Sequence, residues 1–529
     1  MSFFDTVWKN RWAVALVAAA MSITVQASAA QTVSPAVQTA IAPAAPPMIL
    51  TPPAPAAPRI NGPKVYGVRA GSPFLYRVPA TGRRPILFSV EHLPEGLTLD
   101  PQRGILSGAL SQRGEWRLTL TAKNALGESR RDLRIVVGDT LALTPPMGWN
   151  SWYIHYNRVT DPDVRSAADA MVGSGMADYG YEYVNIDDCW AVKIGSNDPA
   201  IGGEPRDADG RIRPNRRFPD MKALTDYIHS KGLKAGIYSS PGPKTCAGYA
   251  GNFQHESLDA TTFAQWGFDF LKYDWCSYTS VAGGKDLPHL KKPYQQMSQE
   301  LRALHRDIVL NLCQYGMGNV WEWGAEVGNC WRTTGDLGLE GGSLSKGIYQ
   351  VGLINAGLSE YAGPGHWNDP DYILIGWVGD AHKMGQGHPT SLTPDEQYTQ
   401  MSMWSLMAAP LIFGGDMSKL DAFTLNVLCN PEVIEIDQDP LGRQARIVEK
   451  TPDMLILCKD LEDGSKALGL FNLSTGPLSM TTSWPALALK GPRRVRDLWR
   501  QRDLGTFDRG FPTQVPPHGV QLLRLSAVD

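Results

Sequence analysis

A lysine and an aspartate lie two residues apart in GFDFLKYDWC, residues 267–276, a segment that is otherwise mostly apolar and aromatic. In a β-strand, side chains two residues apart project from one face, so Lys272 and Asp274 point the same way. Burial of such charges is unfavourable unless they are paired or take part in chemistry. The positive charge of Lys272 would keep Asp274 ionised, as a nucleophile requires, and the alternative is a structural ion pair.

A second aspartate, Asp336, ends the strand-like segment CWRTTGD. Cleavage of an acetal between sugars requires one carboxyl group that protonates the leaving oxygen and another that attacks the anomeric carbon or activates water. Asp274 and Asp336 could supply this pair. A carboxyl separation of about 5–5.5 Å would indicate retention and about 6.5–9.5 Å inversion, and the sequence leaves both open. Arg332, four residues before Asp336, could orient hydroxyls or neighbouring carboxylates.

Two further carboxylate groups, Asp187–Asp188 and the DPD motif of residues 369–371, raise the alternative of a metal site, because hard cations bind clustered carboxylates. His366 and His388, which we expect at strand ends, lack the spacing of zinc ligands. Carboxylates also bind sugar hydroxyls readily. We therefore expect sugar contacts, with no metal and no cofactor.

These residues belong to a region, about 141–440, in which eight strand-like segments alternate with helical ones. This order is typical of a (β/α)8 barrel, an α/β fold whose active sites are built at the carboxyl ends of the strands. Six of the eight predicted strands end in charged or polar side chains, namely Asp187–Asp188, Lys272–Asp274, Gln314, Arg332–Asp336, Asp369–Asp371 and Asp416.

Two β-rich regions flank the predicted TIM barrel. Residues 59–138 alternate polar and apolar positions between Gly, Pro and Asn turns, which predicts a small N-terminal β-sandwich module. Its GSPFLYRVPATG and LPEGLTLDPQRGILSGAL segments resemble immunoglobulin-like modules of bacterial secreted proteins. Residues 441–529 read as antiparallel strands and predict a C-terminal β-sandwich domain.

The N-terminus resembles an export signal. Lys9 and Arg11 precede an apolar stretch, and the small residues ASA follow at 27–29. The apolar run is shorter than the roughly 20 residues of a membrane-spanning helix, so a cleaved signal peptide over 1–30 is favoured over an anchor. Residues 31–58, rich in Ala and Pro, predict a disordered or semi-extended linker. We expect a secreted or periplasmic protein with no membrane contact after cleavage.

The composition restricts the partners. The chain has 529 residues with a formal net charge of -3, from 50 basic and 53 acidic residues. This balance provides no electrostatic footprint for nucleic acid, so we expect no nucleic-acid partner. A neutral carbohydrate fits better, and a homo-oligomer is compatible with the sequence. Export permits disulfides, and the seven cysteines leave at least one unpaired.

Seven motifs occur in an order that resembles the retaining α-galactosidases of glycoside hydrolase family 27. The resemblance extends from about 141 through the C-terminal domain. It implies an exo-acting enzyme that releases terminal α-linked galactose from oligo- or polysaccharides by double displacement. The motifs are PPMGWNSW, YEYVNIDDCW, GLKAGIYSSPGPKTCAGY, FDFLKYDWC, WRTTGD, GPGHWNDPDYILIG and MSMWSLMAAPLIFGGDM.

The same resemblance implies roles for individual residues. Asp274 would be the nucleophile and Asp336 the acid/base. The predicted substrate-binding residues are Asp187 and Asp188 for O4 and O6 of galactose, Lys272 for O3, Arg332 for O2, and Trp152, Tyr238, Cys246 and Asp371 as further pocket lining, together with Gln314, which is discussed below. Cys246 and Cys276 match a disulfide at the pocket wall.

Departures from the family pattern concern the fifth predicted strand and the cysteines. CQY replaces the common CEW, so Gln314 stands where a glutamate contacts O2, and a neutral amide can still bind a hydroxyl. The bulk of Gln314 and Tyr315 argues against N-acetylgalactosaminidase activity. His366 is expected either at the pocket rim or behind it. Cys189 is expected to be a free thiol because Asn157 occupies its partner's position, and pairing of Cys313 with Cys330 stays open.

Three alternatives to an α-galactosidase remain. A β-L-arabinopyranosidase of the same family would bind a sugar that lacks the hydroxymethyl group, and the retained Asp187–Asp188 doublet favours galactose. A catalytically silent carbohydrate-binding protein would be expected to lack one of the two catalytic aspartates, and both are present. A metal-dependent transferase that uses the DPD motif would be sensitive to chelator.

Overall fold

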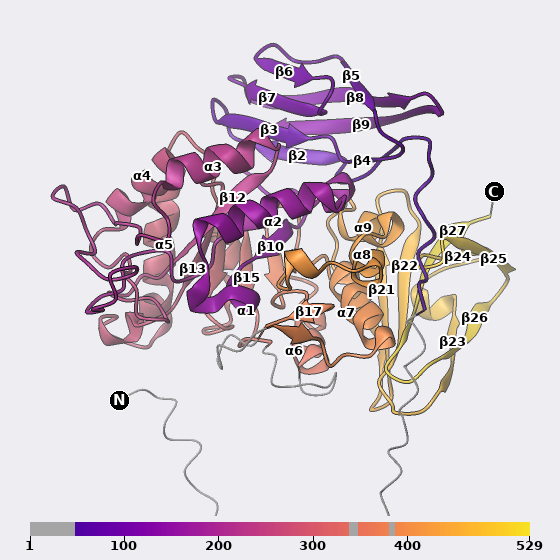
Figure 1. Ribbon diagram of the computed structural model, residues 1–529. Coiled ribbons are helices and arrows are strands. Elements are labelled where there is room, and N and C mark those ends of the chain that lie inside the picture. The colour runs from indigo at the N-terminus through magenta and orange to yellow at the C-terminus, as the bar shows by residue number, and fades with distance from the viewer. Residues whose placement is uncertain (1–47, 338–346, 380–386, 529) are drawn as a thin grey trace, which may run out of the picture. The chain divides into compact units, whose positions relative to one another are not determined.

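The computed structural model describes residues 48–337, 347–379 and 387–528 (Figure 1). The predicted signal peptide and residues 31–47 of the predicted linker lie outside the described residues. Residues 48–58, the end of that linker, contain no helix or strand. The backbone N–H of Leu50 donates to the hydroxyl of Tyr398, and that of Thr51 donates to the side chain of Asn426. This part of the linker is therefore hydrogen-bonded to helices α7 and α8, whose bounds are given below.

The central sheet confirms the predicted (β/α)8 fold. Eight parallel strands, all of them among the predicted segments, follow one another in the order β16-β15-β14-β13-β12-β11-β10-β19. A parallel bridge between Ile373 and Phe413 joins the two ends of this order and closes the sheet. The strands are β10 (Met147–Asn150), β11 (Tyr183–Asn185), β12 (Lys234–Ser239), β13 (Phe270–Asp274), β14 (Val309–Cys313), β15 (Cys330–Arg332), β16 (Trp367–Asp369) and β19 (Leu411–Phe413).

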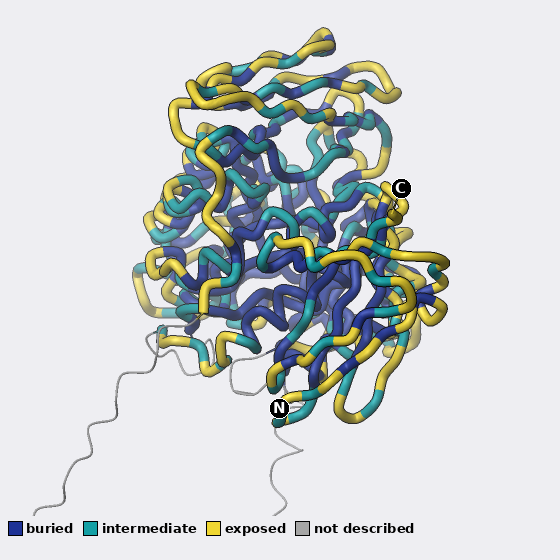
Figure 2. The backbone as a smooth tube through the Cα atoms, turned by 90° about the vertical axis from the view of Figure 1, so that its right-hand side faces the viewer, coloured by how far each residue is buried: buried dark blue, intermediate teal, exposed yellow. Residues whose placement is uncertain are grey.

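Burial of the barrel strands explains their sequence pattern. Every residue of β12, β13 and β14 is buried, because helices cover the outer face and side chains fill the interior. Such strands read as nearly continuous apolar runs, and a charged residue among them requires a partner. Figure 2 shows the buried backbone concentrated in the barrel and in the C-terminal sheet.

Helices connect the barrel strands. Two of them begin with capping boxes, in which Thr160 pairs with Asp163 and Thr393 pairs with Glu396, each followed by a proline in the first turn. The segment NVWEWGAEVG forms two short 3-10 helices, η4 (Val320–Glu322) and η5 (Gly324–Glu326). The α-helices are α1 (Trp152–His155), α2 (Asp161–Gly173), α3 (Met221–Ser230), α4 (Glu256–Trp266), α5 (Leu287–Arg302), α6 (Ile348–Ala356), α7 (Pro394–Leu406), α8 (Ala422–Leu428) and α9 (Pro431–Asp437).

The N-terminal module is a β-sandwich with a core of its own. One sheet has the order β2-β9-β8-β5 and the other β3-β7-β6, and β1 pairs with β4. The strands are β1 (Arg59–Ile60), β2 (Val65–Val68), β3 (Pro73–Arg77), β4 (Ala80–Thr81), β5 (Leu87–Glu91), β6 (Leu97–Asp100), β7 (Ile105–Ala109), β8 (Gly114–Asn124) and β9 (Gly127–Val137).

The C-terminal domain is antiparallel, as predicted. A six-stranded sheet in the order β20-β21-β22-β27-β24-β25 lies with the hairpin β23-β26, and apolar residues from both form a separate core. The strands are β20 (Arg446–Lys450), β21 (Met454–Asp460), β22 (Lys466–Asn472), β23 (Leu478–Ser483), β24 (Arg493–Asp497), β25 (Arg502–Phe507), β26 (Gly510–Val515) and β27 (Val520–Ala527).

The N-terminal module contacts the barrel at the amino ends of its strands. Arg69, which follows β2, pairs with Asp307, two residues before the first residue of β14, at 2.7 Å. The same guanidinium donates to the backbone carbonyls of Arg302 and Leu304. Since the carboxyl ends of parallel strands lie at the opposite face, the module leaves that face uncovered (Figure 1).

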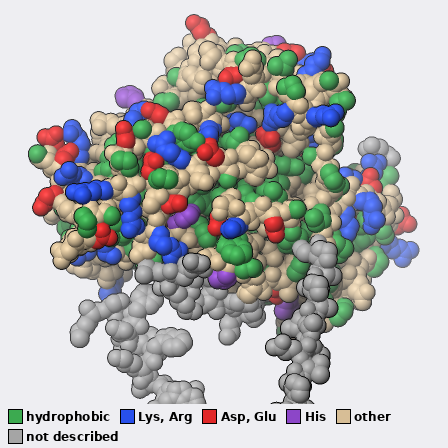
Figure 3. All heavy atoms as spheres, in the orientation of Figure 1, with side chains coloured by type: hydrophobic (Ala, Val, Ile, Leu, Met, Phe, Trp, Pro, Cys, Tyr) green, Lys and Arg blue, Asp and Glu red, His purple; other side chains and the backbone are tan. Residues whose placement is uncertain are grey.

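The surface agrees with the near-neutral charge. Figure 3 shows basic and acidic side chains interspersed over one face of the molecule, without an extended region of one sign. Within the described residues, no helix combines the length and the apolar character needed to cross a membrane.

Candidate active site

The polar groups predicted at the strand ends lie together at the carboxyl face of the barrel. Several of them are almost completely buried although they carry charge or an amide, which is unfavourable without partners. The buried members are Asp187 and Asp188 after β11, Tyr238 in β12, Lys272 and Asp274 in β13, Gln314 after β14, Arg332 in β15 and Asp371 after β16.

Asp274 accepts three hydrogen bonds. The hydroxyl of Tyr238 donates to Oδ2 at 3.0 Å, and the hydroxyl of Tyr315 donates to Oδ1 at 2.7 Å. The backbone N–H of Trp275 also donates to Oδ1, at 2.7 Å. Burial raises the pKa of Asp274, while the charge of Lys272 and the Tyr315 and Trp275 donors lower it. The net effect is a pKa above the usual value for an aspartate, and the three donors hold this desolvated carboxyl group in a fixed orientation.

Lys272 differs from the expectation in its ion-pair partner. Its Nζ lies 2.8 Å from Oδ2 of Asp187, and the hydroxyl of Tyr372 donates to the same oxygen at 3.3 Å. The ammonium also lies over the rings of Tyr238 and Tyr372, 5.3 Å from each centroid. Lys272 thus makes an ion pair across strands with Asp187, and it acts on Asp274 through its field.

Asp188 is held by backbone N–H groups. Cys189 donates to Oδ1 at 2.6 Å and Ala247 donates to Oδ2 at 2.9 Å. Burial raises the pKa of Asp188 to about 7. Ala247 lies in the loop that the disulfide between Cys246 and Cys276 ties to the end of β13.

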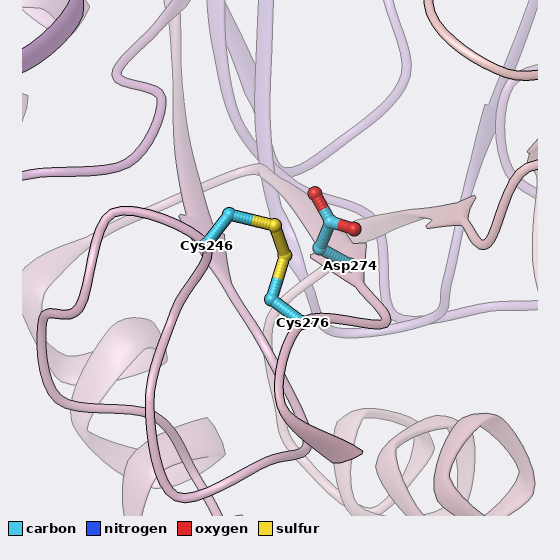
Figure 4. Close-up of side chains that lie close together, drawn as sticks. All are labelled: Cys246, Asp274 and Cys276. Carbon is cyan, nitrogen blue, oxygen red and sulfur yellow. A yellow bond between two sulfur atoms is a disulfide. The ribbon is translucent and has the colours of Figure 1, made fainter. Parts of the chain in front are cut away.

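Figure 4 shows this disulfide beside the carboxylate of Asp274. Among the described residues, the group of side chains with metal-ligand spacing is Cys246, Asp274 and Cys276. The two sulfurs are bonded to each other, so they do not provide thiolate ligands. The disulfide lies beside Asp274 and joins the loop after β12 to the end of β13.

Arg332 connects Asp336 with Asp371. One guanidinium nitrogen lies 3.3 Å from Oδ1 of Asp336, and the other lies 3.0 Å from Oδ2 of Asp371. Asp371 also accepts hydrogen bonds from the hydroxyl of Tyr153 and the backbone N–H of Leu337. The Asp336 side chain is 43% exposed, whereas those of Arg332 and Asp371 are buried. Asp336 is thus the solvent-facing carboxyl of the site.

Gln314 and Trp152 complete the predicted set. Gln314 is 1% exposed, yet within the described residues neither its amide oxygen nor its amide nitrogen has a hydrogen-bond partner. Such an unsatisfied buried amide is unusual, and a water molecule or a ligand hydroxyl could satisfy it. Trp152 begins α1 after β10, is partly buried, and packs its ring edge-to-face against Tyr156.

Three residues expected near the pocket have other roles or places. His366 directly precedes β16 and lines a cavity with Arg69 at the amino end of the barrel, so the expected rim contact is wrong. His388 lies in the exposed hairpin strand β18 (His388–Pro389), paired with β17 (Trp377–Val378). Asp416 caps the 3-10 helix η6 (Met417–Lys419) by accepting from the Ser418 N–H.

The cysteines other than the disulfide pair are free and buried. Cys189 is therefore a free thiol, as expected. Cys330 lies opposite Asn311 in the β14–β15 register, two residues from Cys313, so these two thiols are not bonded to each other.

The sequence did not predict the hydrogen bonds that three tyrosines make at the site, although Tyr315 was noted there for its bulk. Tyr315 binds Asp274, Tyr372 binds Asp187, and Tyr153 binds Asp371. Tyr315 and Tyr372 each directly follow a strand-end residue of the predicted set, which is the signal that could have identified them. Tyr153 lies next to Trp152.

Comparison with known protein families gives matches to three parts of the chain. A family model for α-galactosidase A matches residues 144–439, one for the α-galactosidase C-terminal β-sandwich domain matches 451–525, and one for an Ig domain matches 57–138. α-Galactosidase A of Cellvibrio japonicus is 37% identical over 73% of this chain and 93% of its own length.

Several solved structures are also similar to this chain in sequence and fold. A protein from Bacteroides fragilis, 36% identical with a TM-score of 0.81, covers 91% of this chain and 99% of its own. A family 27 β-L-arabinopyranosidase from Geobacillus stearothermophilus is 28% identical with a TM-score of 0.65, over 73% of this chain and 97% of its own.

Proposed function

This chain belongs to the α-galactosidases of glycoside hydrolase family 27, and on that premise we propose that Asp274 is its nucleophile and Asp336 its acid/base. The observation that carries the proposal is the contrast between the two carboxyls. Asp274 is buried, held by three donors and close to the charge of Lys272. Asp336 is exposed at the mouth and contacts the guanidinium of Arg332.

The proposed reaction has two displacements. In the first, an oxygen of Asp274 attacks the anomeric carbon, the glycosidic bond breaks, and the proton of Asp336 moves to the leaving oxygen. In the second, Asp336 takes a proton from water, the water oxygen attacks the anomeric carbon, and the bond to Asp274 breaks. The configuration is retained because the anomeric carbon is inverted twice.

The remaining groups fit a neutral sugar with many hydroxyls. Asp187 and Lys272 offer an acceptor and a donor side by side, and Asp188 adds a second carboxylate. Gln314 brings an amide with no partner among the described residues, and a hydroxyl of the substrate can satisfy it. We assign terminal α-linked galactose to this pocket, and no residue in the proposed steps requires a metal.

The test is hydrolysis of p-nitrophenyl α-D-galactopyranoside beside the β-L-arabinopyranoside, with and without chelator. A strong preference for the galactoside that chelator does not change is expected. Preference for the arabinoside would favour the arabinopyranosidase alternative, which the likeness to the Geobacillus enzyme supports. Inactivity on both would favour a silent binding protein, and loss of activity with chelator would favour the metal-dependent alternative.

A second test addresses the nucleophile. Asp274→Asn should abolish turnover while galactose still binds, because the amide keeps the shape of the side chain but does not attack the anomeric carbon. Near-normal hydrolysis by this variant would refute the assignment.

We also propose export from the cytoplasm. The apolar stretch and ASA motif within residues 1–30 and the Cys246–Cys276 disulfide support it, since disulfides persist in oxidising compartments. N-terminal sequencing of the protein from the periplasm or medium should begin near residue 30. A chain that stays cytoplasmic with its first residues intact would contradict the proposal.

A further inference from the structure

The hydroxyl of Tyr315 lies 2.7 Å from Oδ1 of Asp274, and Tyr315 follows the end of β14, the strand next to the one that carries this aspartate. Asp274 is paired with Cys313 in the register of β13 and β14, so Tyr315 follows two residues beyond the paired position. The two side chains therefore meet across neighbouring strand ends.

The backbone at Tyr315 is unusual. Its φ is 64°, in the left-handed region that bulky residues rarely adopt, and Gly316 follows with φ 82°. A Cβ on Gly316 would lie 2.4 Å from the carbonyl oxygen of Thr333, so the chain turns tightly against the next strand end. A strained conformation of this kind persists where surrounding contacts enforce it.

The hydrogen bonds distinguish the two oxygens of Asp274. Oδ1 accepts from the Tyr315 hydroxyl and from the Trp275 N–H, whereas Oδ2 accepts from the Tyr238 hydroxyl. A carboxylate oxygen has two acceptor positions in the plane of the group. Both positions of Oδ1 are thus occupied, and the described residues leave one position of Oδ2 free.

We propose that Tyr315 is a positioning residue that selects Oδ2 of Asp274 as the attacking atom and retains Oδ1 as the carbonyl oxygen of the glycosyl ester. This inference rests on the proposed role of Asp274 as nucleophile. When the bond between Oδ2 and the anomeric carbon forms, the glycosidic bond breaks and its electron pair leaves with the protonated aglycone oxygen. When water later displaces Asp274, the electron pair of the ester bond returns to the carboxylate, and Tyr315 and Trp275 again donate to Oδ1.

The charged and titratable groups around Asp274 determine how its pKa changes when the hydrogen bond from Tyr315 is removed. Lys272 faces it from its own strand, Tyr238 from β12, Cys313 from β14 and Tyr294 from α5, and Asp336 acts on it from the end of β15. Burial raises the pKa values of the tyrosines and of the Cys313 thiol, so these groups stay protonated. The Tyr315 hydroxyl lowers the pKa of Asp274, so its removal raises that pKa.

The experiment compares Tyr315→Phe with Tyr273→Phe. Tyr273 lies in the same strand as Asp274, projects from the other face, and has a buried hydroxyl without a hydrogen-bond partner among the described residues. Thermal unfolding and the pH profile of kcat/KM are measured with p-nitrophenyl α-D-galactopyranoside. For Tyr315→Phe we expect the acidic limb to move up by about half a pH unit or more and the plateau to fall about tenfold. Tyr273→Phe should match the wild type.

The possible outcomes distinguish a failure of the inference about Tyr315 from a failure of the proposed α-galactosidase function. A wild-type enzyme that does not hydrolyse the galactoside would overturn both. An active wild type with an unchanged acidic limb and plateau in Tyr315→Phe would overturn this inference alone, even if the melting temperature falls. A second variant, Tyr315→Leu, should move the limb in the same direction, and an unmoved limb there would also contradict the proposal.

Discussion

At the scale of single residues, the site contains polar groups that have no hydrogen-bond partner within the described part of the chain. Gln314 is the clearest example, because a buried amide without partners destabilises the free protein by about 1–3 kcal/mol. The strained φ of Tyr315 next to it adds a further unfavourable contribution. Unfavourable local features of this kind cluster at functional sites, which agrees with the binding role that we propose for this strand end.

Gln314→Met is therefore expected to stabilise the protein and impair the enzyme. The unfolding free energy should rise by about 1 kcal/mol, since an unsatisfied amide becomes an apolar group of similar size. KM should rise about tenfold, because a sugar hydroxyl loses its partner. Chemical denaturation and steady-state kinetics measure both effects.

The matched control is Gln444→Met. Gln444 is buried with both amide atoms bonded, to Asn368 and to the carbonyl of Asn355. The same substitution there should lower the unfolding free energy by about 1–3 kcal/mol, because it leaves those partners unsatisfied. Equal signs of the two stability changes would refute the reading of Gln314.

The proposed acid role of Asp336 predicts that the effect of its removal depends on the leaving group of the substrate. Asp336→Ala should lower kcat/KM for an unactivated galactoside such as raffinose by about 100-fold or more, while p-nitrophenyl galactoside loses much less. The reason is that p-nitrophenolate leaves without protonation. Asp416→Ala, which removes a helix-capping aspartate at another strand end, should leave the ratio unchanged. Equal losses on both substrates would contradict an acid role.

At the scale of elements, the loop after β12 carries both a disulfide bond and a hydrogen bond to a carboxylate of the site. The disulfide anchors Cys246 to Cys276, two residues after the proposed nucleophile. One residue further along the loop, Ala247 donates its N–H to Asp188. The loop thus connects the carboxylate of Asp188, after β11, to the end of β13, where the disulfide fixes it.

Replacement of both Cys246 and Cys276 by serine is expected to affect stability and binding together. The unfolding free energy should fall by about 2–4 kcal/mol, because the unfolded chain loses a cross-link. KM should rise severalfold, since the Ala247 donor is no longer held on Asp188. Reduction of the wild type with dithiothreitol should reproduce the KM change, and an unchanged KM in both cases would refute the link.

At the scale of the whole molecule, the N-terminal module acts as a cover over the amino face of the barrel. Its contacts with the barrel are polar and specific, with Arg69 bound to Asp307 and Arg77 and Arg84 close to Asp178. These contacts lie at the face opposite the site. A contribution to the stability of the barrel follows more directly from this placement than a contribution to substrate capture.

Arg69→Met should therefore lower the unfolding free energy by about 2–3 kcal/mol and leave KM unchanged. The guanidinium is only 17% exposed, and its loss leaves Asp307 without its ion-pair partner. The control is Arg113→Ala, whose pair with Asp139 is largely exposed and should contribute little. A changed KM in Arg69→Met would indicate that the module acts on the site.

Several features followed from the sequence because local physical rules govern them. Apolar runs that end in Asp187–Asp188 and Lys272–Asp274 predicted buried parallel strands, and their alternation with helices predicted the barrel. The eight strands were identified correctly. The disulfide between Cys246 and Cys276 was implied by family resemblance, and spacing alone does not predict it.

Other features depended on the register between strands. The shared face of Lys272 and Asp274 was expected to make them a pair, yet Lys272 bonds to Asp187 from another strand. His366 was assigned to a strand end, but the strand begins just after it, which places it at the opposite face. In both cases the positions of the residues along the sequence were read correctly. Those positions do not determine which residue of another strand lies next to them in space.

The sequence by itself determined the fold class, the family and the set of strand-end side chains. These follow from hydrophobic patterning and from motifs that each lie within one segment. The tertiary structure decided which of these side chains touch: that Tyr315 and Tyr238 bind opposite oxygens of Asp274, that Arg332 connects Asp336 with Asp371, and that Gln314 is buried with neither amide atom hydrogen-bonded to a described residue. The physical reason is that hydrogen bonds depend on distances of about 3 Å and on direction, and these are set by strand register and barrel closure.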